Sequence, residues 1–143
     1  MKKYRINSGV NLVVLPTTQF KTLHIAIDFV APALTSNISA RSLLSYLMAV
    51  SARQYPTQQE VAQKTIDLYG AQYQTDVYRF GQTHHVRVTL QLPAPDYIDD
   101  GNDLLVDAFN FLQEMIFDPL LDGQKFDRKV LSLIHISEPT RHA

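Results

Sequence analysis

The segment Gln82–Leu92, QTHHVRVTLQL, alternates in hydrophobicity along its length and constrains the fold more than any other part of the sequence. This period of two is typical of a β-strand buried on one face, because successive side chains of a strand point to opposite faces. One face carries His84, Val86, Val88, Leu90 and Leu92, and the other carries His85, Arg87, Thr89 and Gln91. Gly81 separates this segment from a second β-prone run, Ala71–Phe80, so we expect an antiparallel pair.

Three more strands are expected before residue 32. Tyr4–Ile6 and Val10–Leu15 flank the turn-forming sequence Asn7-Ser8-Gly9, which suits a hairpin. The third segment, Thr22–Ala31, also alternates, and its apolar face consists of Leu23, Ile25, Ile27 and Phe29.

Helical periodicity predicts four helices. The first begins near Ser39, with an inward stripe of Leu43, Leu44, Leu47 and Met48. The second opens at a capping box, Thr57-Gln58-Gln59-Glu60, and ends at Gly70, with Val61, Ala62, Ile66, Leu68 and Tyr69 turned inward. The third spans Asn102–Phe117, and a fourth begins near Gly123.

The expected order of elements is therefore ββ–β–αα–ββ–αα. This order predicts an α+β fold, in which paired helices pack on one face of a mainly antiparallel sheet.

Composition indicates a globular protein and excludes several functions. Of the 143 residues, 45% are hydrophobic and 19% are charged, and the formal net charge is −1. There is no basic stripe, so we expect no nucleic-acid partner. Without cysteine there can be no disulfide, thiolate zinc site or cysteine nucleophile. Neither a signal peptide nor a run of about 18 apolar residues is evident, so we expect no membrane contact and a cytoplasmic location.

The end of the sequence does not continue the helical pattern. Leu131–Arg141, LSLIHISEPTR, corresponds codon for codon to one reading frame of a common transposase-type sequencing adapter. We therefore interpret residues 131–143 as an adapter-derived artefact and residues 1–130 as the N-terminal part of an incomplete domain. We also expect the Leu104–Ile116 helix face to be partly exposed, and the chain to be poorly soluble alone.

The residues that could support chemistry each have a structural interpretation. His84 and His85 are adjacent in a strand, so their rings should lie on opposite faces and not share a metal ion. Asp96, Asp99, Asp100 and Asp103 precede or begin a helix, where capping explains them better than cation binding. Ser42 and Ser45 lack a glycine-flanked elbow and an evident base, so we expect packing or surface roles rather than nucleophiles.

Most of the chain resembles one family of peptidases. The resemblance extends from about Gly9-Val10 to Lys129 and rests on short motifs in a fixed order: Phe20-Lys21-Thr22, Ala40-Arg41, Tyr55-Pro56-Thr57, Leu68-Tyr69-Gly70-Ala71 and Asp118-Pro119-Leu120. In this pattern the chain is similar to the N-terminal domain of the insulinase/pitrilysin-type zinc peptidase family, and more closely to a bacterial branch without the zinc motif. The resemblance implies an insulinase/mitochondrial-processing-peptidase-like metallohydrolase fold.

The same resemblance indicates where the zinc motif has degenerated. Active members carry His-x-x-Glu-His on the first helix, with two zinc ligands and a general base. Counting back from Tyr55-Pro56 places Ser42 and Tyr46 at the histidine positions and Ser45 at the glutamate position. Hydroxyl groups are poor zinc ligands at neutral pH, and without the carboxylate no base activates water. We therefore expect no catalytic residue, no metal site and no cofactor.

The resemblance implies a non-catalytic subunit or peptide-holding scaffold. Its expected partners are an active zinc peptidase relative and an extended peptide or protein client, and the branch is associated with elongation factor P modification. Two alternatives remain open. One is an active zinc metallopeptidase with unusual ligands drawn from Ser42, Ser45, Tyr46, His84 and His85; the other is a stand-alone peptide-binding domain.

Overall fold

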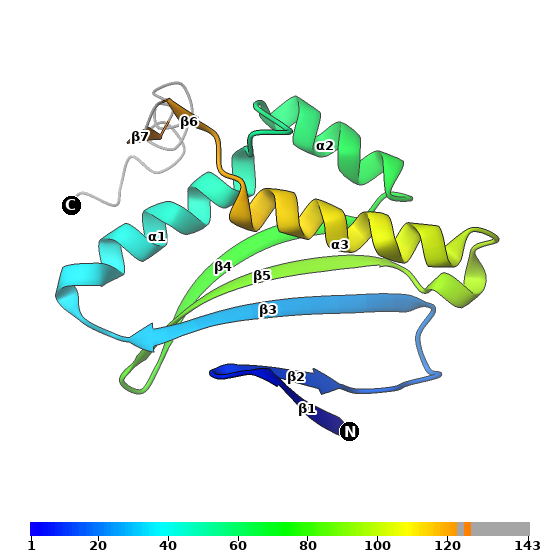
Figure 1. The fold of residues 1–143 in the computed structure, drawn as a ribbon, viewed down its shortest axis with the longest axis horizontal. Helices are drawn as coiled ribbons and strands as arrows, with labels where there is room; N and C mark the ends of the chain where they lie inside the picture. The colour runs from blue at the N-terminus through cyan, green and yellow to red at the C-terminus, as the bar shows by residue number, and fades with distance from the viewer. Residues whose placement is uncertain (123–124, 127–143) are drawn as a thin grey trace.

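In the computed structural model, which describes residues 1–122 and 125–126, a three-stranded antiparallel sheet lies beneath three helices (Figure 1). The strands of this sheet are β3 (Thr22–Pro32), β4 (Gln72–Phe80) and β5 (Thr83–Pro93), in the order β3-β5-β4. The helices are α1 (Thr35–Val50), α2 (Gln58–Asp67) and α3 (Gly101–Phe117). The predicted α+β class with antiparallel strands is confirmed.

Two hairpins stand apart from the main sheet. Strands β1 (Lys2–Asn7) and β2 (Val10–Val14) pair only with each other, as do the short strands β6 (Leu121–Asp122) and β7 (Lys125–Phe126). A 3-10 turn, η1 (Pro95–Tyr97), leads into α3. Only glycine fits at position 101, the first residue of this helix, because a Cβ there would clash with the backbone carbonyl of Pro95.

The core forms between β5 and α3, as the alternation of β5 predicts. Central strand β5 has neighbours on both sides, and its inward residues Val86, Val88, Leu90 and Leu92 are at most 3% exposed. Opposite them, α3 buries Leu104, Ala108, Phe111, Leu112 and Met115. The partial exposure expected for the Leu104–Ile116 face holds only for Leu105 and Ile116, which are half-buried, because the sheet covers the rest.

The capping box that opens α2 is confirmed, but three of the five residues predicted for its apolar face are exposed. The Thr57 hydroxyl accepts a hydrogen bond from the Glu60 amide, and the Glu60 carboxylate accepts one from the Thr57 amide. The helix itself ends at Asp67 with Leu68 as its C-cap, so the predicted cap at Gly70 is two residues late; Gly70 lies in the following turn at φ +71°. Val61 and Leu68 are buried as predicted, whereas Ala62, Ile66 and Tyr69 are exposed because α2 contacts the core along a narrow strip.

Helix α1 differs from prediction in both its start and its buried face. It begins at Thr35, not near Ser39, after an N-cap residue, Leu34, that makes no side-chain capping bond. Leu47 and Met48 are buried as expected, but Leu43 and Leu44 are 38% and 39% exposed. Ser42 and Ser45 are buried in their place. Small side chains on the sheet-facing side allow α1 to pack close to the strands.

Two predictions concern the region after α3. The fourth helix was expected from Gly123, but residues 125 and 126 belong to β7. The rest of that helix and the proposed adapter segment from Leu131 lie outside the described residues. At the start of α3, Asp103 lies in the first turn, where it complements the helix dipole. Asp100 occupies the N-cap position but makes no side-chain capping bond, so capping by this residue is wrong.

Candidate functional site

The three degenerate positions lie on α1, and its register turns two of them toward the sheet. Ser42 is 7% exposed and Ser45 is 3% exposed, whereas Tyr46 is half-buried. The two serines therefore have packing roles, one of the options that the sequence left open. They are three residues apart and so occupy the same side of the helix.

Hydrogen bonds from β4 hold α1 in this register. The Thr75 hydroxyl donates to the carbonyl oxygen of Ser45 at 2.8 Å. The Tyr73 hydroxyl donates to the carbonyl oxygen of Met48, also at 2.8 Å. Met48 belongs to the last turn of α1, where carbonyl groups lack partners within the helix. Burial raises the pKa of Tyr73 well above its usual range, so this hydroxyl remains a donor.

A guanidinium group occupies the position beside Ser42. Arg41 Nε donates to His84 Nδ1 at 2.9 Å, and Arg41 Nη2 donates to the carbonyl oxygens of Phe29 and His84. One side chain thus joins α1 to both β3 and β5. The sequence analysis did not identify Arg41 as a site residue. Its position beside an otherwise apolar helix segment was the available signal.

The hydrogen bond from Arg41 fixes the tautomer of the His84 ring. This histidine is 4% exposed. Desolvation, followed by the positive charges of Arg41 and His85, lowers the pKa of His84 below its usual value. Because Nδ1 accepts from Arg41, the neutral ring carries its proton on Nε2. A metal ion bound by this Nδ1 would have to displace a positively charged donor.

His84 and His85 lie on opposite faces of the sheet, as predicted. On the outer face, His85 stacks on Tyr78 with ring centroids 4.5 Å apart. Arg87 makes two hydrogen bonds of 2.7 Å to Asp28, and the bond from Arg87 is the main cause that lowers the pKa of Asp28. His85 Nδ1 lies 3.8 Å from Asp28 Oδ2, which is too far for a hydrogen bond. These groups form a separate structural cluster across three strands.

The donor groups on α1 do not fit a zinc site. Ser42, Ser45 and Tyr46 offer only hydroxyl groups, which are poor zinc ligands at neutral pH, and the neighbouring Arg41 cation opposes the binding of a metal cation. Within residues 1–122 and 125–126, no three His, Asp or Glu side chains are grouped closely enough to hold a metal ion. The prediction of no metal site rests on these features of the donor groups.

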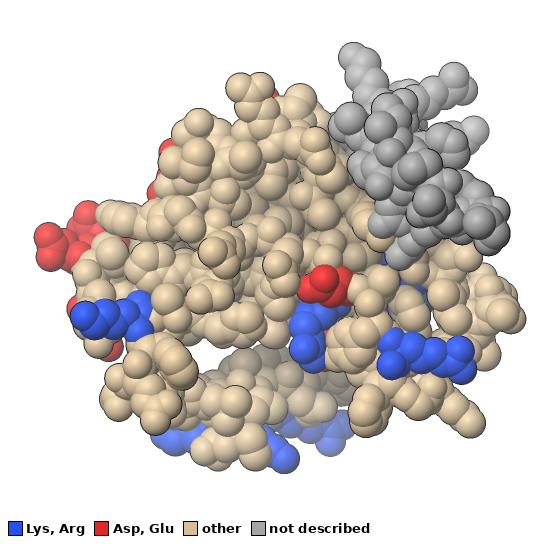
Figure 2. All heavy atoms as spheres, turned by 180° about the vertical axis from the view of Figure 1, so that it is seen from behind, with Lys and Arg blue, Asp and Glu red and all other residues tan. Residues whose placement is uncertain are grey.

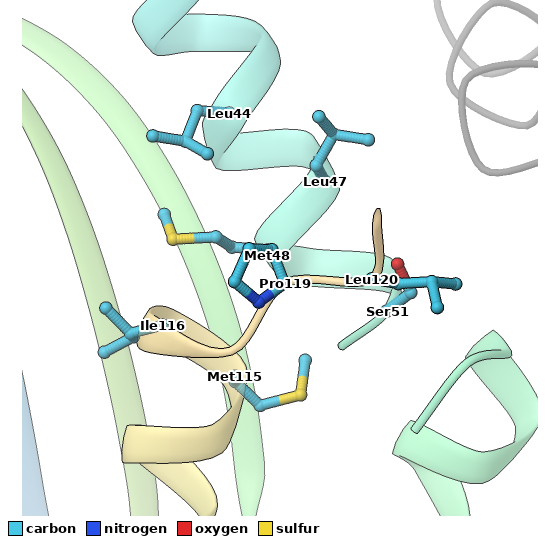
Figure 3. Close-up of a pocket in the computed structure, with 8 residues that line it drawn as sticks. All are labelled: Leu44, Leu47, Met48, Ser51, Met115, Ile116, Pro119 and Leu120. Carbon is cyan, nitrogen blue, oxygen red and sulfur yellow. The ribbon is translucent and has the colours of Figure 1, made fainter. Parts of the chain in front are cut away.

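The structure contains a small pocket between α1 and α3 (Figure 3). Its volume is about 30 Å³, enough for about one water molecule. The lining is largely aliphatic: Leu44, Leu47, Met48, Ser51, Met115, Ile116, Pro119 and Leu120. Such a space lacks the converging polar groups of an active site.

A larger groove lies beside the free edge of β4. It has a volume of about 480 Å³ and is bounded on one side by Gln72, Tyr73 and Gln74 of β4. The other side is formed mainly by α2, with Gln58, Val61, Ala62 and Thr65. Because β4 is an edge strand, its outward backbone groups are available to a further extended chain.

The hydrogen-bonded pair of Arg41 and His84 predicts that the stability of the fold depends on pH. Between the lowered pKa of folded His84 and the unfolded value of about 6.5, the unfolded chain binds more protons than the folded chain. The free energy of unfolding should therefore decrease as pH falls below about 6.5 and level off below the folded-state pKa. Urea unfolding between about pH 5 and 8 measures this slope.

One variant tests the assignment of that pH dependence to His84, and a second serves as its control. His84→Gln keeps an acceptor near Arg41 but does not titrate, so it should reduce the slope. His24→Gln, at an exposed position on β3, should leave it unchanged. An identical slope in the wild type and His84→Gln would contradict the assignment.

Comparison with known proteins identifies a relative by sequence. No family model matches the chain. Over 126 residues, 88% of its length, the chain is 24% identical to the "probable inactive metalloprotease YmfF" of Bacillus subtilis (strain 168). The chain is a homologue of that protein. This relationship agrees with the resemblance to a peptidase branch without the zinc motif.

A solved structure shows the same arrangement of elements. A conserved protein from Enterococcus faecalis V583 matches 95% of the chain with a TM-score of 0.90 and 28% sequence identity. The chain spans about a third of each relative, 30% of the Bacillus protein and 32% of the Enterococcus chain. Among the described residues, no helix is long and apolar enough to cross a membrane.

Proposed function

We propose that the chain is part of a catalytically inactive insulinase-type peptidase homologue that serves as a non-catalytic subunit or peptide-holding scaffold. The observation that carries the proposal is the state of α1. Ser42 and Ser45 are packed against the sheet, and Arg41 binds His84 beside them. Hydrolysis by this family needs two imidazoles and a general base at these positions. The relationship to a probable inactive metalloprotease supports the same conclusion.

The proposed partner is an active zinc peptidase relative, and the proposed client is an extended peptide or protein. A link to elongation factor P modification and a cytoplasmic location form part of the proposal. On the face shown in Figure 2, basic side chains are scattered and do not form a continuous patch. This distribution favours a protein client over nucleic acid.

The groove beside β4 is the proposed place for the client. An extended peptide there can pair with the backbone of Gln72–Gln74, while its side chains contact α2. The groove volume of about 480 Å³ lies within the usual range for ligand sites. Strand addition relies on backbone groups, which suits a scaffold that holds varied sequences.

The binding experiment compares two tryptophan substitutions on α2. Ala62 lines the groove, whereas Gln63 is exposed and does not line it. With fluorescein-labelled unfolded casein as probe, Ala62→Trp should weaken binding about tenfold or more, equivalent to about 1.4 kcal/mol. Gln63→Trp should change it by less than about twofold. Equal effects of the two variants, or undetectable binding by the wild type, would contradict the proposed groove.

Catalysis is tested separately. The purified protein, incubated with the same casein and zinc, should give no cleavage that a chelator abolishes. Casein should be cleaved once an active zinc peptidase relative is added, and the two proteins should co-purify. Zinc bound in stoichiometric amounts together with chelator-sensitive cleavage by the protein alone would favour the unusual-ligand enzyme. Casein binding with no interaction with an active relative would favour a stand-alone peptide-binding domain.

A further inference from the structure

The β1–β2 hairpin lacks a structural partner among the described residues. Every residue of both strands is exposed. The two strands pair with each other and make no extensive contact with another described element. An isolated two-stranded hairpin is at best marginally stable in water. Its stability therefore requires further contacts.

The hairpin has one apolar face that those contacts would bury. Tyr4 lies opposite Leu12, and Val10 and Val14 share that face because they alternate with Asn11 and Val13. These four side chains are 38–49% exposed. The opposite face carries Lys3, Arg5, Asn11 and Val13, and Lys2 lies opposite Val14 at the end of the apolar face. An apolar cluster on one face of a hairpin is typical of strands that belong to a sheet with one buried face.

Strand β3 provides the other side of an incomplete sheet. It pairs with β5 along one edge only, and its second edge is open. Its inward residues, Leu23, Ile25, Ile27 and Phe29, are half-buried, although their direct partners on β5 are almost fully buried. An open edge eleven residues long is a ready template for another strand.

The hairpin and the open edge of β3 face each other across open space. Figure 1 shows the hairpin running beside β3, on the side of β3 that faces away from β5. In the space-filling view from behind, open space separates the lowest part of the molecule from the body above it (Figure 2). The connection from β2 to β3, residues 15–21, joins the hairpin to one end of β3.

The lengths of the relatives identify the occupant. Each relative matches nearly all of this chain but has about two thirds of its own length outside the match. We propose that at least one β-strand from the corresponding part of a longer polypeptide inserts between β2 and β3. The hairpin, the inserted strand and the β3-β5-β4 sheet then form one continuous sheet. This inference does not depend on the proposed function.

Hydrogen exchange measured by mass spectrometry tests this insertion. It compares the 143-residue chain with a longer polypeptide in which the chain is extended by sequence corresponding to the unmatched part of the relatives. Peptides from Val10–Val14 and Thr22–Pro32 should exchange on the order of 100-fold more slowly in the longer protein, because their open-edge amides gain partners. The outer edge of β4, Gln72–Phe80, is the matched control and should keep its fast-exchanging amides in both proteins.

Comparison of the two edges within the longer protein is sufficient, even if the shorter chain is poorly folded. Equally fast exchange at the open edges of β3 and β4 would overturn the proposal, and so would equal protection of both. Protection of β3 in the 143-residue chain that rises with protein concentration, together with dimers in sedimentation, would assign the space to a second copy instead. Protection that needs added unfolded casein would assign it to a client peptide.

Discussion

Replacement of Phe111 by alanine should lower the free energy of unfolding by about 3–5 kcal/mol, the largest effect expected for a single substitution in this chain. Phe111 is fully buried at the centre of α3. Its ring centroid lies 5.5 Å from that of Tyr55 and 5.2 Å from that of Tyr73. Truncation therefore removes two aromatic contacts and leaves a cavity between helix and sheet. Urea unfolding followed by circular dichroism measures the change.

Phe109→Ala is the matched control. Phe109 lies on the same helix, but its side chain is 51% exposed. Its truncation should change the free energy of unfolding by less than about 1 kcal/mol. A similar loss for both variants would mean that the core does not form around Phe111.

The second large effect is expected at Arg41. Arg41→Met retains much of the aliphatic stem but removes every hydrogen bond to His84 and to the Phe29 carbonyl. An unsatisfied buried polar group costs about 1–3 kcal/mol, and this substitution leaves more than one. We expect a loss of about 2–4 kcal/mol in the free energy of unfolding. The size of the decrease in the free energy of unfolding below about pH 6.5 should also differ from that of the wild type, because His84 loses a neighbouring cation.

Arg53→Met separates this effect from the general loss of an arginine. Arg53 binds Asp118 at 2.9 Å, but the two side chains are 57% and 38% exposed. Such surface pairs contribute about 0–1 kcal/mol. If Arg53→Met were as destabilising as Arg41→Met, the proposed role of Arg41 in joining α1 to the sheet would be wrong.

Phe111 and Arg41 illustrate how α3 and α1 are held on the sheet. Phe111 and its neighbours form an ordinary core between α3 and the sheet. Arg41 fills the region next to the degenerate positions with a charged group whose hydrogen bonds are satisfied within the domain. The region is therefore stable without a metal ion.

The sequence by itself determined the strands, the capping of α2 and the lack of His and Glu residues in α1. Alternation in Gln82–Leu92 identified the buried face of β5, because a strand's side chains alternate whatever its surroundings. The capping box at Thr57 depends on residues three apart, so it is also visible locally. The residue types at Ser42, Ser45 and Tyr46 can be read directly, without any knowledge of the fold.

Only the tertiary structure decided which side of α1 faces the sheet. Hydrophobicity favoured Leu43 and Leu44, but contacts from distant strands turned Ser42 and Ser45 inward. Arg41 and His84 are 43 residues apart, and no local pattern relates them. A periodic sequence specifies that a helix has a buried face, whereas its rotation is set by the partners that pack against it. Those partners are brought together only when the chain folds.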